Sequence, residues 1–305
     1  MSKTRKIQRV IRSKPTYEGA GVHLHRAFGS ARDARLFDPF LLFDDFRNDN
    51  PGNYAPGFPW HPHRGIETIT YVLKGSVEHG DSIGNEGVIA AGDVQWMTAG
   101  SGIRHKEMPK GDQDGRMYGF QLWANLPRHK KMMSPRYQEI KSSEIPIVKV
   151  EGGITVRVIC GEFAGVSGPV ENIIINPQYL DVSVPADTRF TLPTTPGHTA
   201  LIYVIEGMAT FCEETKLFAY QLEGKNYFDM EFDPTLGDKN LILYEDGDQI
   251  LVATEQQPVR FLFVSGRPIK EPIAWYGPIV MNTEKELRKA FFELQDGTFI
   301  KTKAD

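Results

Sequence analysis

The chain has 305 residues, of which 40% are hydrophobic and 24% are charged, a globular composition that excludes wholesale disorder. Its 35 Lys and Arg residues are offset by 39 Asp and Glu residues, and the net charge of −4 argues against a dedicated nucleic-acid-binding protein. Two cysteines, Cys160 and Cys212, are too few for a disulfide framework or an all-cysteine zinc site.

The N-terminal segment is basic, with six Lys or Arg residues among the first seventeen and no acidic residue. It predicts a strand with Ile7 and Ile11 on one face and basic side chains in solvent, in preference to a nucleic-acid-binding arm. It lacks the apolar core of a signal peptide, and no apolar run approaches the roughly 20 residues of a membrane span. We therefore expect a cytoplasmic protein that contacts neither nucleic acid nor a membrane directly.

Strand-like segments dominate the rest of the chain, in keeping with 29 Gly and 20 Pro residues spread along it. Residues 66–75 are rich in β-branched side chains and end at glycine, and residues 88–97 predict two strands joined by a Gly-Asp turn. Residues 199–207 and the Gly247-Asp248 pair repeat this plan in outline. The repeat predicts two similar β domains.

A short helix is predicted at residues 283–294, where apolar side chains recur at helical spacing. Thr283 and Glu286 can form a capping box at its start. The predicted fold is therefore all-β, with two β-barrel domains and one short C-terminal helix. We place the domains at residues 1–135 and 136–305, with an insertion in the second domain near residues 213–240.

Two histidine-containing pairs carry the chemistry. His61 and His63 are two residues apart, as are His105 and Glu107 about forty residues later. Side chains two apart on an extended strand share a face, so each pair can chelate. Continued alternation would place four further side chains on the face of the first pair, those of Glu67, Ile69, Tyr71 and Leu73. If both segments lie in one barrel, three imidazoles and one or two carboxylates converge.

Imidazole and carboxylate ligands suit Fe(II), Mn(II), Ni(II), Cu(II) and Zn(II). Three or four protein ligands leave positions open on a six-coordinate ion, which favours catalysis or ligand binding over a closed structural site. A single His-x-His pair is equally typical of a solvent-exposed loop. The second pair, between strand-forming stretches, favours the metal site.

Residues 61–75 and 92–109 resemble the two cupin motifs in the form found in the pirin family. The first begins His-Pro-His-Arg-Gly-Ile-Glu, and the second contains Gly-Ser-Gly-Ile-Arg-His-Lys-Glu. The similarity spans nearly the whole chain and continues in residues 12–22, 119–127, 135–139 and 277–283. It implies a bicupin, in which two jelly-roll (double-stranded β-helix) barrels follow one another and the N-terminal barrel holds one metal ion.

The resemblance implies an iron site, with Fe(II) the first expectation and Mn, Ni, Cu or Zn as alternatives. The ligands it implies are His61, His63, His105 and Glu107. Glu67 matches the carboxylate ligand of other cupins, and we expect it near the metal, hydrogen-bonded to a ligand or to water. The C-terminal barrel lacks a His-x-His pair, so we expect it to be metal-free.

Similarity to quercetin 2,3-dioxygenases within the family implies that O2 cleaves a flavonol or related phenolic with loss of carbon monoxide. Glu107 would accept the flavonol hydroxyl proton. The residues predicted to line the substrate pocket are Ile69, Trp96, Met97, Phe120 and Gln121. Other pirins are associated with transcription, so the alternative is a non-catalytic, iron-dependent redox-sensing interaction protein or transcription cofactor with a protein partner. A different cupin enzyme is a third alternative, because the same ligands support several reactions.

Overall fold

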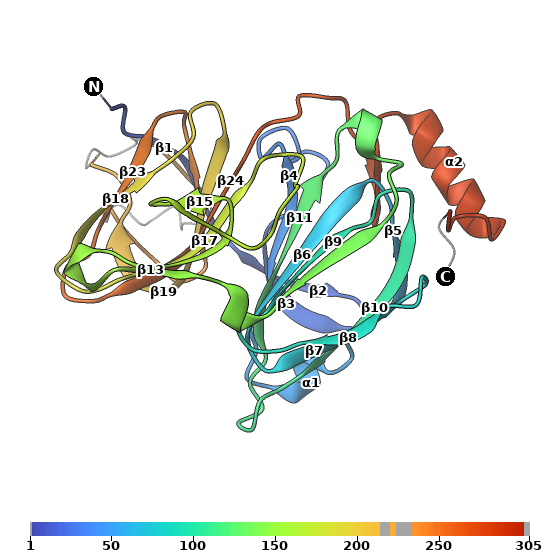
Figure 1. Cartoon of the computed structure of the whole chain (residues 1–305), viewed down its shortest axis with the longest axis horizontal. Helices are drawn as coiled ribbons and strands as arrows, with labels where there is room; N and C mark the ends of the chain where they lie inside the picture. Colours follow the sequence, from blue (N-terminus) through green and yellow to red (C-terminus); the bar gives the residue numbers. More distant parts are fainter. Residues whose placement is uncertain (1, 214–219, 224–233, 302–305) are drawn as a thin grey trace. The chain divides into compact units, whose positions relative to one another are not determined.

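The computed structural model describes residues 2–213, 220–223 and 234–301 (Figure 1). The insertion predicted near residues 213–240 therefore lies largely outside the described residues. The chain divides into two compact units. The histidine unit contains Lys14–Glu144 and Ile269–Asp305, and the second unit contains Met1–Ser13 and Ile145–Pro268.

This division differs from the linear one predicted at residues 135 and 136. The first strand, β1 (Ile7–Arg12), pairs with β22 (Asn240–Tyr244) in the second unit, where its apolar side chains are buried. The C-terminal segment Ile269–Asp305 joins the histidine unit instead. Strand pairing and burial between distant segments decide this membership, and no local pattern in the sequence signals it.

The histidine unit is built from antiparallel strands. They are β2 (Lys14–Glu18), β3 (Val22–Phe28), β4 (Phe40–Asp45), β5 (Phe58–His63), β6 (Ile66–Lys74), β7 (Ser76–Asp81), β8 (Glu86–Ile89), β9 (Val94–Thr98), β10 (Ile103–Lys110), β11 (Tyr118–Asn125) and β12 (Arg136–Ile140), with a C-terminal hairpin of β25 (Ala274–Tyr276) and β26 (Ile279–Met281). The helical segments are α1 (Pro51–Tyr54), η1 (Arg128–Lys130), η2 (Ser142–Glu144) and α2 (Glu284–Gln295).

Two sheets form the body of this unit. One has seven strands in the order β12-β9-β6-β11-β4-β3-β2, and the other has four in the order β5-β10-β7-β8. Among the described residues, backbone pairing does not join them into a closed barrel. Instead they form the two layers of a jelly roll, and Figure 1 shows β5 and β10 side by side in the smaller sheet.

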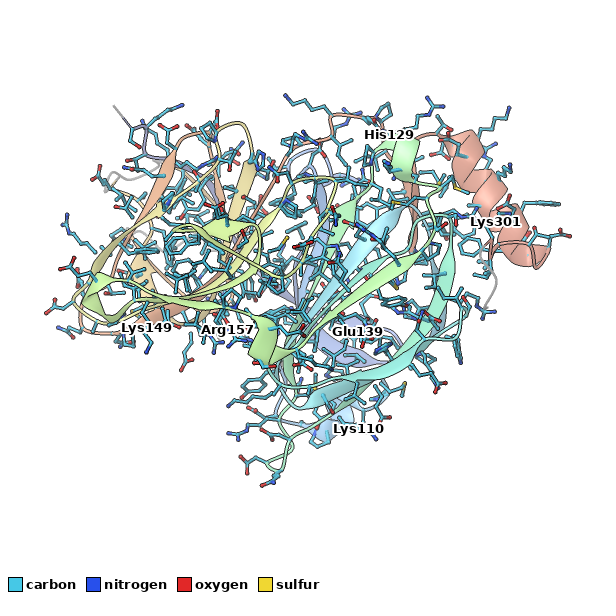
Figure 2. All side chains as sticks on the ribbon, in the orientation of Figure 1. Lys110, His129, Glu139, Lys149, Arg157 and Lys301 are labelled. Carbon is cyan, nitrogen blue, oxygen red and sulfur yellow. The ribbon has the colours of Figure 1, made fainter. Side chains whose placement is uncertain are left out.

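In the part of the second unit that the structure describes, the strands form one sheet system of eleven and a small hairpin. Besides β1 and β22, its strands are β13 (Ile147–Lys149), β14 (Thr155–Cys160), β15 (Glu162–Phe163), β16 (Val166–Ser167), β17 (Gln178–Val184), β18 (Arg189–Pro193), β19 (Thr199–Thr210), β20 (Gln221–Glu223), β21 (Thr235–Gly237), β23 (Gln249–Ala253) and β24 (Val259–Gly266), with one 3-10 turn, η3 (Glu151–Gly153). Side chains such as Val182, Ile202 and Phe261 are fully buried in its core. Figure 2 shows side chains filling the space between the strands of each unit.

The structure confirms the all-β class and the local elements predicted from sequence. Residues 66–75 form β6, and residues 88–97 cover the end of β8 and most of β9 around the predicted turn. The predicted helix is α2, and Thr283 and Glu286 form its capping box. No helix of the described chain is both long and apolar enough to cross a membrane.

The junction between β5 and β6 decides which side chains reach the interior. Gly65 there has a φ of +78°, and a Cβ atom at this position would lie 2.0 Å from the Val280 carbonyl oxygen. Only glycine fits this backbone comfortably. Because the chain passes from one sheet to the other at Gly65, the alternation that begins at His61 does not continue into β6. The expected common face of the histidines with Glu67 and Ile69 is therefore not formed.

Candidate metal centre

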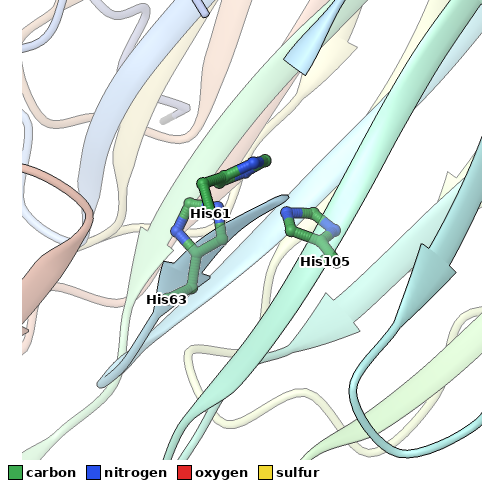
Figure 3. Close-up of side chains that lie close together, drawn as sticks. All are labelled: His61, His63 and His105. Atoms are coloured by element: carbon green, nitrogen blue, oxygen red, sulfur yellow. The ribbon is translucent and has the colours of Figure 1, made fainter. Parts of the chain in front are cut away.

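Three imidazoles converge between β5 and β10. The two strands are antiparallel, with His105 directly opposite His61 and Ile103 opposite His63. The ring centroids lie 4.4 Å apart for His61 and His105, 4.8 Å for His61 and His63, and 5.0 Å for His63 and His105. One nitrogen from each ring lies within 4.8 Å of the others, and Figure 3 shows the grouped rings. Such a group could hold a metal ion.

The environment of these rings keeps their nitrogens available. His63 and His105 are 2% and 1% exposed, and no described residue accepts or donates a hydrogen bond at either ring nitrogen of His105. Nδ1 of His61 lies 2.8 Å from the Pro59 carbonyl oxygen. In the tautomer in which Nδ1–H donates to this carbonyl, Nε2 keeps its lone pair. Buried nitrogens without partners are costly unless a ligand satisfies them, so these residues fit a cation.

Electrostatics act in the same direction. Burial, and then the charge of neighbouring histidines, lowers the pKa of His63 and of His105 well below the ordinary imidazole value. Both rings are therefore neutral at pH 7, which is the state that binds metals.

Glu107 lies beside the group on β10. Its Oε2 atom is 3.7 Å from His105 Nε2, and its Oε1 atom is 3.2 Å from the Thr70 hydroxyl oxygen. The β5–β10 register shifts between His105 and Glu107, which places Glu107 opposite Phe58. Burial raises the pKa of Glu107, although nearby His61 and the Thr70 hydroxyl oppose this rise. The side chain can act as a fourth ligand or as a proton acceptor.

His61 and His63 line a cavity of about 710 Å³ within the histidine unit, and Glu107 lines it as well. Both sheets and the C-terminal segment contribute to its wall. Its aromatic lining residues are Phe46, Tyr54, Phe58, Trp123, Trp275 and Tyr276. Trp123 also packs edge-on against His63, with ring centroids 5.1 Å apart. The cavity therefore joins a polar centre to a largely apolar, aromatic space, as small-molecule sites commonly do.

One of the five predicted pocket residues, Gln121, lines this cavity. Ile69, Trp96 and Phe120 are buried on the opposite face of the seven-stranded sheet. Ile69 is the chain neighbour of Thr70, and Phe120 is that of Gln121, so their side chains point away from the cavity. Trp96 is the register partner of Ile69 and shares its face. Met97 is fully buried in an apolar cluster that includes Ile103. These four residues thus belong to the core, which corrects the prediction.

Glu67 also departs from its predicted place. It is fully buried and accepts a hydrogen bond of 2.7 Å from the Thr98 hydroxyl on β9. It does not line the cavity, and alternation along β6 directs it away from Thr70. Burial raises its pKa, against the effect of Thr98 and Trp96.

Sequence reasoning missed Thr70, Trp123 and the C-terminal stretch Trp275–Pro278, all of which line the cavity. Thr70 would have been predicted if the inward face of β6 had been taken as the one that carries Thr70 and not the one that carries Glu67. The sequence does not signal which face is inward, because the chain passes between the sheets at Gly65. The C-terminal stretch is fixed by pairing of the Val280 N–H with the Arg64 carbonyl at 3.0 Å. This contact joins residues over 200 positions apart in the chain.

Two buried basic side chains, those of Arg64 and Lys131, hold that segment next to His63. Arg64 donates hydrogen bonds of 2.7 Å to Ser101 O, Glu293 Oε2 and Phe299 O. Lys131 Nζ donates to three oxygens, those of Gly65 (2.9 Å), Asn125 (2.6 Å) and Val280 (2.9 Å). The C-terminal segment is thus an integral part of the wall around the candidate metal centre.

Comparison with known proteins bears on both halves of the chain. The Pirin model matches residues 21–124, and the model of the Pirin C-terminal cupin domain matches residues 179–300. A pirin-like protein of Caulobacter vibrioides is 42% identical over 296 residues, covering 97% of this chain and 99% of the relative. The chain belongs to the pirin family. This membership confirms the resemblance and the two cupin-type domains.

Other proteins similar to this pirin-family chain are named either as pirins or as quercetin 2,3-dioxygenases. Pirin of Homo sapiens is 35% identical over 97% of this chain and 94% of its own length. A crystal structure of quercetin 2,3-dioxygenase from Acinetobacter baumannii matches with a TM-score of 0.84 and 31% identity, covering 97% of this chain and 99% of that one. The fold is thus shared over 97% of this chain with a protein that bears an enzyme name.

Proposed function

We propose that this pirin-family protein is a metal-dependent dioxygenase that uses O2 to cleave quercetin or a related flavonol or phenolic. The observation that carries the proposal is a group of three imidazoles, two of them buried and neutral, beside a buried carboxylate at an aromatic-lined cavity. The similarity to the Acinetobacter baumannii quercetin 2,3-dioxygenase supports it.

His61, His63, His105 and Glu107 would hold the ion, and we propose Fe(II) as the native metal. The same ligand types also suit Mn(II), Ni(II), Cu(II) and Zn(II), so metal analysis must decide. When bound, the cation would supply Lewis acidity and a path for electrons between a phenolic oxygen and O2.

The chain's own residues have three tasks in this proposal. The aromatic walls formed by Phe58, Trp123 and Trp275 would hold a flat ligand and exclude water. Glu107 would take the flavonol hydroxyl proton as a general base. The neutral histidines add no positive charge that would compete with the cation.

The test is a flavonol oxidation assay with metal-free protein and protein reconstituted with Fe(II). We expect quercetin absorbance to fall and carbon monoxide to be released only after reconstitution. His105→Gln should abolish turnover, whereas His129→Gln, at an exposed histidine on the surface (Figure 2), should leave it unchanged. Unchanged quercetin with fully loaded protein, or full activity of the His105 variant, would contradict the proposal.

A further inference from the structure

A row of polar side chains crosses the cavity face of the seven-stranded sheet. Arg26 on β3 is the register partner of Asp44 on β4, Asp44 of Gln121 on β11, and Gln121 of Thr70 on β6. Directly opposed residues of antiparallel strands share a face, with Cβ atoms about 5 Å apart. All four residues line the cavity, so the row is a continuous polar track across this sheet.

One end of the row meets the candidate metal centre. The Thr70 hydroxyl oxygen lies 3.2 Å from Glu107 Oε1 and donates a hydrogen bond of 2.7 Å to Gln121 Oε1. Gln121 is half-buried and makes no other hydrogen bond with the described residues. Its amide nitrogen is therefore a donor that faces the cavity without a protein acceptor.

The other end of the row presents acceptors. Arg26 donates through Nε and Nη2 to the two carboxylate oxygens of Asp44, both at 2.7 Å, and through Nη1 to Glu18 at 2.7 Å. The guanidinium therefore fixes the Asp44 carboxylate in one orientation. Each carboxylate oxygen can accept more than one hydrogen bond, so Asp44 retains acceptor capacity toward the cavity.

We propose that Gln121 and Asp44 together bind a hydroxyl group on the part of the ligand remote from the histidines, and so make the cavity selective for hydroxylated aromatic compounds. A hydroxyl both accepts and donates, and it can therefore take the Gln121 amide hydrogen while donating to Asp44. A ligand without this hydroxyl would leave the Gln121 amide hydrogen without an acceptor in a largely apolar cavity, and such a loss is costly. The inference rests on the proposed function, because it names the feature by which that site selects its phenolic ligand.

The test is equilibrium binding to the metal-loaded protein without O2, so that no turnover occurs. The probes are 3-hydroxyflavone and its 4′-hydroxy and 7-hydroxy derivatives, which place a hydroxyl at either end of the molecule. We expect one derivative to bind about tenfold more tightly than the parent, as a hydrogen-bonded pair of this kind predicts. Gln121→Leu should remove this preference by weakening that derivative alone.

Gln95→Leu is the matched control. Gln95 lies on β9, where it is the register partner of Thr70. Its amide donates a hydrogen bond to Glu139, and the residue does not line the cavity. The control should keep the preference. If Gln121→Leu does not fold, Gln121→Met replaces it, because both remove the amide. Equal binding of all three flavones to the native protein, or equal weakening of all three by the variant, would overturn the inference alone. Absence of any flavone binding would overturn the proposed function together with it.

Discussion

His105 on β10 lies directly opposite His61 on β5, with ring centroids 4.4 Å apart. The two strands are separated in the chain by four others of the two sheets, and only their antiparallel pairing brings the rings together. With His63 they form one cluster, so the loss of a single ring should affect the entire site.

We expect His61→Gln and His105→Gln each to lower the affinity for a divalent metal by more than about tenfold. Loss of a residue that only hydrogen-bonds a metal ligand already lowers metal affinity by about tenfold or more, and loss of the ligand itself should cost more. Competition titration against a chelator measures this directly. The unfolding temperature provides a second readout, because metal added to the native protein should raise it and metal added to either variant should raise it much less. Equal affinity of native protein and variants would exclude the histidine cluster as the metal site.

Glu107→Gln should separate metal binding from proton transfer. The amide keeps the shape of the side chain but is not a base. We therefore expect kcat for flavonol cleavage to fall by about 10²-fold or more, the range typical of general-base removal. Metal content of the purified variant should be measured alongside, because a fall in activity that tracks the loss of metal would instead indicate a ligand role alone.

The buried histidines predict that the metal-free protein loses stability at low pH. Below about pH 6.5 the unfolded chain binds a proton at His105, whereas the folded chain, with its depressed pKa, does not. The unfolding free energy should therefore fall with decreasing pH below this value, by up to about 1.4 kcal/mol per pH unit for this residue.

Urea unfolding of native protein and His105→Gln between pH 7.5 and 5.5 isolates this contribution. The buried carboxyl groups Glu67 and Glu107 have raised pKa values and act in the opposite direction, but they are common to both proteins. The variant should therefore gain stability relative to the native protein as the pH falls. A constant difference across this range would contradict the depressed pKa.

Arg64→Met should destabilise the histidine unit strongly. Arg64 is 2% exposed and donates to Glu293 of α2 and to the carbonyl oxygens of Ser101 and Phe299. Its removal leaves the two buried carbonyls without this donor, whereas Glu293 keeps Lys301 at 3.0 Å. Each buried acceptor left without a donor typically costs about 1–3 kcal/mol. Arg128→Met is the matched control, because Arg128 pairs with Glu286 of the same helix but has a 67% exposed side chain. The control should cost less than about 1 kcal/mol by urea unfolding. Equal effects of the two variants would show that burial of Arg64 is unimportant.

Local sequence patterns were sufficient for the secondary structure around the site. The β-branched run at residues 66–75, the Gly-Asp turn before β9 and the Thr283–Glu286 capping box each depend on neighbouring residues, and each is present. The spacing of His61 and His63, and of His105 and Glu107, also indicated the cluster, because alternation within one strand is a local property.

The sequence by itself thus determined the strands, the C-terminal helix and the candidate ligands. The tertiary structure alone decided which face of β6 borders the cavity, because that face depends on where the chain crosses between sheets at Gly65. It also decided that Thr70 and Trp123, and not Ile69 and Phe120, line the cavity. The place of the C-terminal segment beside His63 follows from hydrogen bonds of Arg64 and Lys131 to residues far along the chain. Contacts of this kind have no local signature, since their free energy is gained only when the distant segments meet.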